Sequence, residues 1–143
     1  MLLPLSSLCS EVKMTIYNLT QHNITKDQES AGVVELNEIC QGEVKSYLTF
    51  TSIPDRKKIQ ENARRLVASL LAYHPTAQKV LIGGAPFFMS ALEQALKSRG
   101  IEAVYAFTQR VVEEKDGVKT SVFRHEGFIP SYRWNKNSFK KSL

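Results

Sequence analysis

The chain has 143 residues, of which 43% are hydrophobic and 23% charged, a composition that excludes a disordered or fibrous protein. Its formal net charge of +5 permits a polyanionic ligand without requiring one, and no apolar run is long enough for a transmembrane helix. Its two cysteines, Cys9 and Cys40, lack partners at metal-ligand spacing. We therefore expect one cytoplasmic domain with reduced thiols and a sizeable hydrophobic core.

Two features at the ends of the chain set the expected domain boundaries. Residues 1–13 include an apolar stretch without the basic start of a secretion signal, and Met14, a second possible initiator, precedes a strand-like run. The last residues are rich in lysine and arginine. We expect an N-terminal extension at residues 1–13, a single domain at residues 14–132 and a basic tail at residues 133–143.

The N-terminal half predicts two short strands and two or three helices. A first strand is expected at Thr15–Leu19, and a capping box at Thr25 and Gln28 predicts a short helix before a second strand at Val33–Leu36. The next residues have helical spacing that Gly42 interrupts, so their structure stays ambiguous. Capping residues and a proline then begin a long amphipathic helix that ends before Pro75.

The segment from residue 79 to residue 110 predicts a strand–helix–strand unit. Val80–Ile82 is a short β-branched run, the glycines of Gly83–Ala85 end it, and Pro86 suits the first turn of a helix that Gly100 closes. A second apolar run follows at Ala103–Phe107. Such a unit carries parallel strands.

The remaining residues predict a hairpin. Val111–Glu113 is strand-like, Asp116–Gly117 is a hairpin turn signal, and Val118–Phe123 returns. Strands that alternate with helices and end in a hairpin predict an α/β fold. We expect a Rossmann-like domain with a mainly parallel sheet flanked by helices and a C-terminal β-hairpin.

The carboxyl ends of the predicted strands carry the candidate site, because ligands bind beyond these ends in parallel sheets. Gly83–Ala85 offers free backbone N–H groups at a helix start, where the dipole favours an anion. Thr108–Arg110 follows the next strand, and arginine provides a planar fork suited to phosphate. Asn18–His22 follows the first strand and offers hydroxyl, amide and imidazole groups for a base or ribose.

Each of these candidate site residues also has an explanation in which it binds no ligand and serves only the fold. The glycine turn matches neither GxGxxG nor GxxxxGK[ST] and also fits a tight turn without a ligand. Arg110 also fits a salt bridge to a hairpin glutamate, and a lone loop histidine such as His22 is usually inert. The histidines lack metal-ligand spacing and no Ser–His–Asp signature is visible. We therefore expect no metal and no cofactor, with any catalysis driven by positioning.

A longer pattern resembles a known family. Tyr105–Arg110 reads Tyr-Ala-Phe-Thr-Gln-Arg, Glu113–Glu114 follows, and Phe123–Phe128 reads Phe-Arg-His-Glu-Gly-Phe. With the glycine turn and helix before them, these motifs resemble the small standalone CARF-type proteins, CRISPR-associated Rossmann-fold ring nucleases of type III systems. The openings Tyr17–Thr20 and Ile24–Gln28 are similar to that family's first strand, polar turn and helix start. The pattern is also similar to that of small phage-encoded proteins.

The resemblance implies a symmetric homodimer whose sheet edges face a shared pocket for cyclic oligoadenylate, a ring of phosphate-linked adenosines. It implies metal-independent cleavage, in which a ribose 2′-hydroxyl attacks the adjacent phosphorus with in-line alignment and oxyanion stabilisation. Carried onto this sequence, the catalytic residues would be Thr108 and Arg110. The ligand-binding residues would be Asn18, Thr20, Gln21, Gly83, Gly84, Ala85 and, through base stacking, Phe87.

Three hypotheses follow. The first is a dimer that binds cyclic oligoadenylate and cleaves it as a metal-independent ribonuclease. The second is a non-catalytic protein that sequesters a nucleotide signal in host–phage conflict. The third is a Rossmann-like enzyme acting on a mononucleotide. None of them involves a membrane or a DNA duplex.

Overall fold

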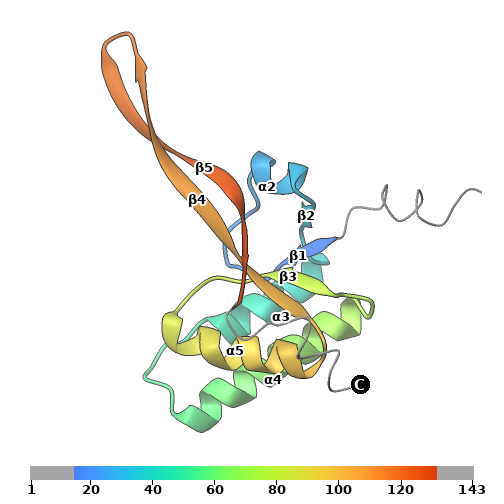
Figure 1. Cartoon of the computed structure of the whole chain (residues 1–143). Helices are drawn as coiled ribbons and strands as arrows, with labels where there is room; N and C mark the ends of the chain where they lie inside the picture. Colours follow the sequence, from blue (N-terminus) through green and yellow to red (C-terminus); the bar gives the residue numbers. More distant parts are fainter. Residues whose placement is uncertain (1–14, 132–143) are drawn as a thin grey trace, which may run out of the picture.

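The computed structural model describes residues 15–131, which form an α/β domain around one five-stranded sheet (Figure 1). The strand order is β2-β1-β3-β4-β5, with β1 to β4 parallel and β5 antiparallel to β4. In chain order the elements are β1 (Ile16–Asn18), α2 (Lys26–Ser30), β2 (Val33–Val34), α3 (Glu38–Leu48), α4 (Arg56–Tyr73), β3 (Lys79–Leu81), α5 (Pro86–Ser98), β4 (Glu102–Lys115) and β5 (Val118–Pro130). The predicted α/β class, mainly parallel sheet and terminal hairpin are confirmed. No helix among the described residues is long and apolar enough to cross a membrane.

Local capping explains where the helices begin. Thr25 and Gln28 form the predicted capping box of α2. The Asp55 side chain accepts a 2.7 Å hydrogen bond from the Lys58 N–H and begins α4. The ambiguous segment is helical, because α3 runs through Gly42, where an added Cβ would meet nothing within 4 Å. An exposed glycine lowers helix propensity without breaking a helix that is packed on its other side.

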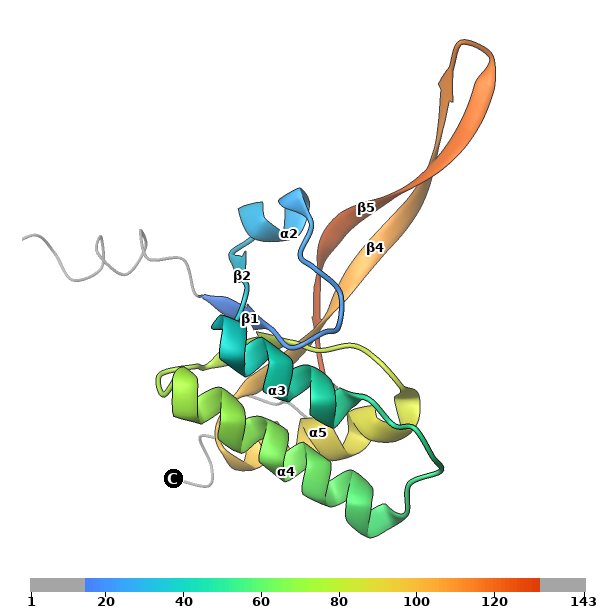
Figure 2. The same cartoon turned by 180° about the vertical axis from the view of Figure 1, so that it is seen from behind.

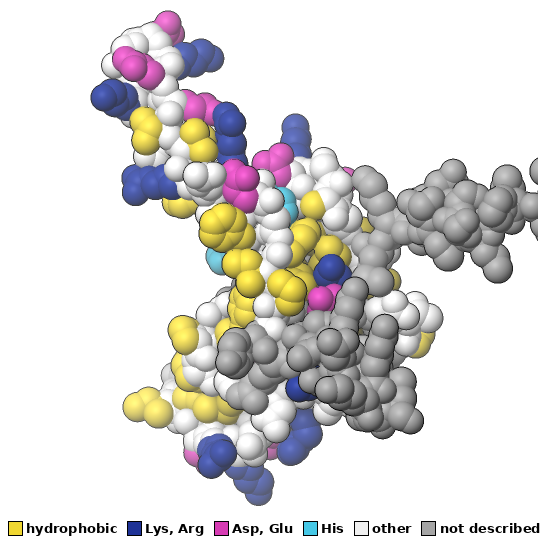
Figure 3. Space-filling view, viewed as in Figure 1, with side chains coloured by type: hydrophobic (Ala, Val, Ile, Leu, Met, Phe, Trp, Pro, Cys, Tyr) yellow, Lys and Arg dark blue, Asp and Glu magenta, His cyan; other side chains and the backbone are white. Residues whose placement is uncertain are grey.

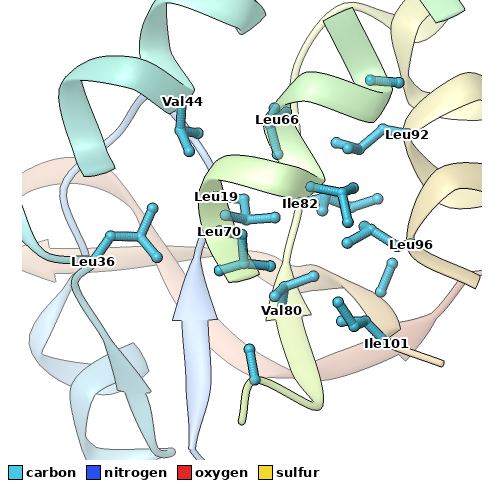
Figure 4. Packing of buried hydrophobic residues seen from close by; sticks show 14 of the residues in the cluster. Leu19, Leu36, Val44, Leu66, Leu70, Val80, Ile82, Leu92, Leu96 and Ile101 are labelled. Atoms are coloured by element: carbon cyan, nitrogen blue, oxygen red, sulfur yellow. The ribbon is translucent and has the colours of Figure 1, made fainter. Parts of the chain in front are cut away.

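The main hydrophobic core lies between the sheet and helices α3, α4 and α5, all three on one side of the sheet (Figures 1 and 2). Val80 and Ile82 point into this core, whereas Leu81 between them belongs to a second cluster on the opposite face, as alternation along a strand requires. Figure 4 shows the main core's side chains converging from sheet and helices. Its labelled members are Leu19, Leu36, Val44, Leu66, Leu70, Val80, Ile82, Leu92, Leu96 and Ile101.

The opposite face of the sheet is covered differently. Leu81 and Val104 are buried there with Ile16 and Val33, and Ile24 and Phe128 pack against them. The short helix α2 lies on this side (Figures 1 and 2), and the base of the terminal hairpin contributes Phe128. The described sheet is therefore layered unequally, with three helices on one face and a loop, a short helix and the hairpin base on the other.

The hairpin is longer than the sequence predicted. Its turn is the expected Asp116–Gly117, and both residues have positive φ, 54° and 79°, as a two-residue hairpin loop demands. The prediction that a strand ends at Phe107 is wrong, because β4 continues without a break to Lys115. Thr108–Arg110 therefore lies in mid-strand. Polar residues are tolerated at these positions because both faces of the projecting hairpin meet solvent. A run of polar residues is typical of a loop and also of a strand exposed on both faces.

A β-bulge divides the hairpin into a base and a projecting part. Phe107 pairs with Gly127 and Thr108 with His125, so Glu126 has no residue opposite it. We call residues 108–126 the arm.

The expected extension at residues 1–13, with Cys9, and the basic tail at residues 133–143 lie outside the described residues. The described cysteine, Cys40, is a buried free thiol, and burial raises its pKa.

Candidate functional site

A cavity of about 370 Å³ lies at the carboxyl ends of β1 and β3. It combines the turn after β1, the residues after α3 and the glycine turn that opens α5. We call it the glycine-loop pocket. Its lining residues are Gln21, His22, Leu48, Thr49, Phe50, Gly83, Gly84, Ala85 and Phe87. Five of the predicted ligand-binding residues, Gln21, Gly83, Gly84, Ala85 and Phe87, therefore meet in one cavity.

The glycine turn supplies hydrogen-bond donors to this pocket. Gly84 has φ of 149°, a conformation that side chains rarely adopt. Pro86 occupies the first turn of α5, and Ala85 at the N-cap offers no side-chain cap. Among the described residues, no turn or side-chain hydrogen bond uses the N–H of Gly83, Gly84 or Ala85. Free N–H groups at the start of a 13-residue helix favour an anion.

Two aromatic rings form the apolar wall. The rings of Phe50 and Phe87 meet edge to face with centroids 5.2 Å apart, and Phe50 also contacts Phe88 at 5.4 Å. Phe88 is buried at 1% exposure, whereas Phe87 is 50% exposed. The two neighbouring phenylalanines thus have different surroundings: Phe88 packs into the core, whereas half of the Phe87 surface is exposed and its ring lines the pocket.

Asn18 and Thr20 shape the turn after β1. The Asn18 Nδ2 donates to the carbonyl oxygen of His22 at 2.8 Å and to Glu35 Oε1 at 2.7 Å. Asn18 Oδ1 accepts from the N–H and the hydroxyl of Thr20 at 3.0 and 2.6 Å. Asn18 is only 5% exposed, and neither residue lines the glycine-loop pocket. The structure therefore gives them a supporting position, in which they fix the turn that carries Gln21 and His22.

Thr108 and Arg110 lie away from the glycine-loop pocket. Both are exposed residues of the arm, opposite His125 and Phe123 respectively, and neither lines the pocket. The expectation that they form one site with the glycine turn stays a prediction. In a single chain neither lines the pocket, and β4 carries both beyond Val104, the partner of the last paired residue of β3. The ring of His125 lies tilted against that of Phe128 with centroids 4.6 Å apart, and its Nδ1 is buried without a hydrogen-bond partner among the described residues.

Sequence reasoning missed Thr49 and Phe50 and left His22 as a loop histidine. Thr49 accepts a 3.0 Å hydrogen bond from Gln21 Nε2, which joins the turn after β1 to the end of α3. Phe50 follows that ambiguous helix, and its position could not be assigned while the helix end was uncertain. Within residues 15–131, no three His, Cys, Asp or Glu side chains are placed to hold a metal ion.

Comparisons with known proteins place the chain in a family. The sequence matches the uncharacterized protein MJ1673 family over residues 14–129, a span that includes the whole pocket and the arm. The chain therefore belongs to the MJ1673 family. No curated protein and no solved structure matches it.

Proposed function

We propose that this member of the MJ1673 family binds a nucleotide in the glycine-loop pocket. The phosphate would accept hydrogen bonds from the N–H groups of the Gly83–Ala85 turn, and the base would stack against Phe87. The observation that carries this proposal is the meeting of unpaired backbone donors and a half-exposed aromatic ring in one cavity. Anions favour helix N-termini, and stacking on an aromatic side chain is sequence-tolerant.

The finer proposal is that the nucleotide belongs to cyclic oligoadenylate and that the domain is Rossmann-like. A strand–helix–strand unit with its glycine turn at the carboxyl end of β3 supports the fold assignment. The cavity, about 370 Å³, is at the small end of ligand sites and is sized for one nucleotide unit. A ring would therefore extend beyond one pocket and engage a second copy of the chain, in agreement with the homodimer that the resemblance implies.

Cleavage of the ring is the enzymatic form of the proposal. The ribose 2′-oxygen would lose its proton and bond to the adjacent phosphorus as the P–O5′ bond breaks, leaving a 2′,3′-cyclic phosphate and a protonated 5′-hydroxyl. The pocket would hold the 2′-hydroxyl in line with the departing oxygen, and the turn amides would stabilise negative charge on a phosphate oxygen. Of the titratable side chains, His22 lines the pocket and is the group placed to exchange a proton there. The catalytic roles of Thr108 and Arg110 depend on the resemblance alone, because these residues do not line the pocket of their own chain.

The decisive experiment is calorimetric titration of the full chain with cyclic tetra-adenylate and with AMP. Phe87→Ala should weaken binding roughly 5- to 150-fold, the loss of one stacked base at about 1–3 kcal/mol. Phe107→Ala is the matched control, because Phe107 is also 50% exposed but lies on β4 outside the pocket. Equal affinities of the wild type and Phe87→Ala would refute the site.

Chromatography of the incubated ring separates the three functional hypotheses. Linear products indicate a ring nuclease, and intact ring released on denaturation indicates a sequestering protein. A protein that binds AMP but does not bind cyclic oligoadenylate would favour the third hypothesis, an enzyme that acts on a mononucleotide.

A further inference from the structure

The arm presents two faces of different character. Side chains alternate along each strand, and directly opposed residues share a face. One face carries the ion pair between Arg124 and Glu113, 2.5 Å apart. The other we call the Arg110 face. Its members, by register, are Thr108, Arg110, Val112, Glu114, Lys119, Ser121, Phe123 and His125.

The Arg110 face carries two apolar side chains near its middle, beside Arg110 and Ser121, and both are exposed within residues 15–131. Phe123 is 71% exposed and Val112 is 62% exposed. The outer arm stands clear of the other described elements in both views (Figures 1 and 2). A two-stranded hairpin alone is marginally stable in water. An arm of this length with an exposed aromatic ring therefore indicates a surface that another molecule covers.

The charges of the arm indicate which kind of molecule covers this surface. Its four cations are balanced by four anions, and Figure 3 shows the two signs mixed with apolar side chains along it. The cations are Arg110, Lys115, Lys119 and Arg124, and the anions are Glu113, Glu114, Asp116 and Glu126. A balanced surface gives no electrostatic advantage to a polyanion, whose affinity depends on excess positive charge.

Arg110 and Glu114 make this face complementary to itself. Neither forms an ion pair with any other residue between 15 and 131, and they lie two positions on either side of Val112. A two-fold axis through Val112 brings Arg110 of one copy against Glu114 of the other, and the same pair forms again by symmetry. The axis also places Val112 against its own copy.

We propose that the Arg110 face is a homodimer interface, in which the arms of two copies pack face to face about a two-fold axis at Val112. The contact is at the small end of specific interfaces, so the dissociation constant is expected on the order of micromolar. This inference rests on exposure and charge in the arm and does not depend on nucleotide binding.

Charge reversal of the full chain tests the proposal by sedimentation velocity at low ionic strength. Arg110→Glu puts two like-charged pairs across the axis, and so does Glu114→Arg. Each variant alone should raise the dimer dissociation constant about 10- to 100-fold. Lys115→Glu is the matched control, because it makes the same change of charge on the opposite face and should leave the dimer intact.

Mixing the two variants provides the sharper result. On this face Arg110→Glu carries two acidic groups beside Lys119, whereas Glu114→Arg carries three basic groups including Lys119, so an equimolar mixture should form a heterodimer. The double reversal should restore a homodimer. Wild-type protein that stays monomeric at about 100 µM would overturn the proposal and leave the face to a different partner. So would an Arg110→Glu variant that dimerises like the wild type, or a mixture that stays monomeric.

Discussion

Phe87 and Phe88 are adjacent in sequence, and their substitution by alanine should have unequal costs. Phe88 is 1% exposed within the main core and contacts Phe50. Its removal leaves a cavity that α5 and the sheet cannot close, so Phe88→Ala should lower the free energy of unfolding by about 3–5 kcal/mol. That is a large part of the roughly 5–15 kcal/mol that stabilises a domain.

Phe87→Ala should cost much less. Half of the side chain is already exposed, so the loss of burial amounts to about 1 kcal/mol, half of the value for a fully buried phenylalanine. The edge-to-face contact with Phe50 adds roughly 0.5–1.5 kcal/mol. Urea unfolding followed by far-ultraviolet circular dichroism gives both values. A Phe87→Ala variant destabilised as much as Phe88→Ala would refute the assignment of one ring to the pocket and the other to the core.

Three further substitutions test other parts of the structure. Burial and the 2.9 Å hydrogen bond to Glu93 raise the pKa of Tyr105, so above pH 10 the unfolded chain loses a proton that the folded chain keeps. Unfolding titrations should therefore show wild-type stability falling more steeply above pH 10 than that of Tyr105→Phe, and parallel curves would contradict this. Gly84→Ala should cost on the order of 1–3 kcal/mol because of its positive φ, whereas Gly83→Ala, whose nearest contact would be a methyl group of Thr20 at 3.5 Å, should be close to neutral by thermal melting.

Local sequence patterns predicted the elements that depend on local physics. The capping box at Thr25, the helix start at Asp55 and the turn at Asp116–Gly117 are confirmed because neighbouring residues alone decide them. The length of β4 was not predictable in this way. Thr108–Arg110 is polar, and a polar run is typical of both a loop and a strand exposed on both faces; only the pairing with β5 decides between them.

The candidate site was predictable in part for the same reason. The glycine turn and Gln21 meet because parallel strands bring their carboxyl ends together, which the sequence pattern reveals. Phe50 follows α3, which packs against α4, and its ring meets Phe87 and Phe88 of α5. No local sequence pattern encodes these contacts. The sequence likewise could not show that the polar atoms of Asn18 are used within its own turn.

The unpaired Glu126 gives the arm an adjustable direction. A bulge bends its strand and increases the local twist, and this one lies at the junction between the hairpin base and the arm. Beyond it, the two strands follow each other to the turn without meeting the core. Loss of Glu126 would straighten the junction and swing the whole arm, and a gain or loss of opposed residue pairs nearer the turn would change its reach. Changes at the bulge or near the turn would therefore alter the orientation and the length of the arm while the sheet and its helices stay unchanged.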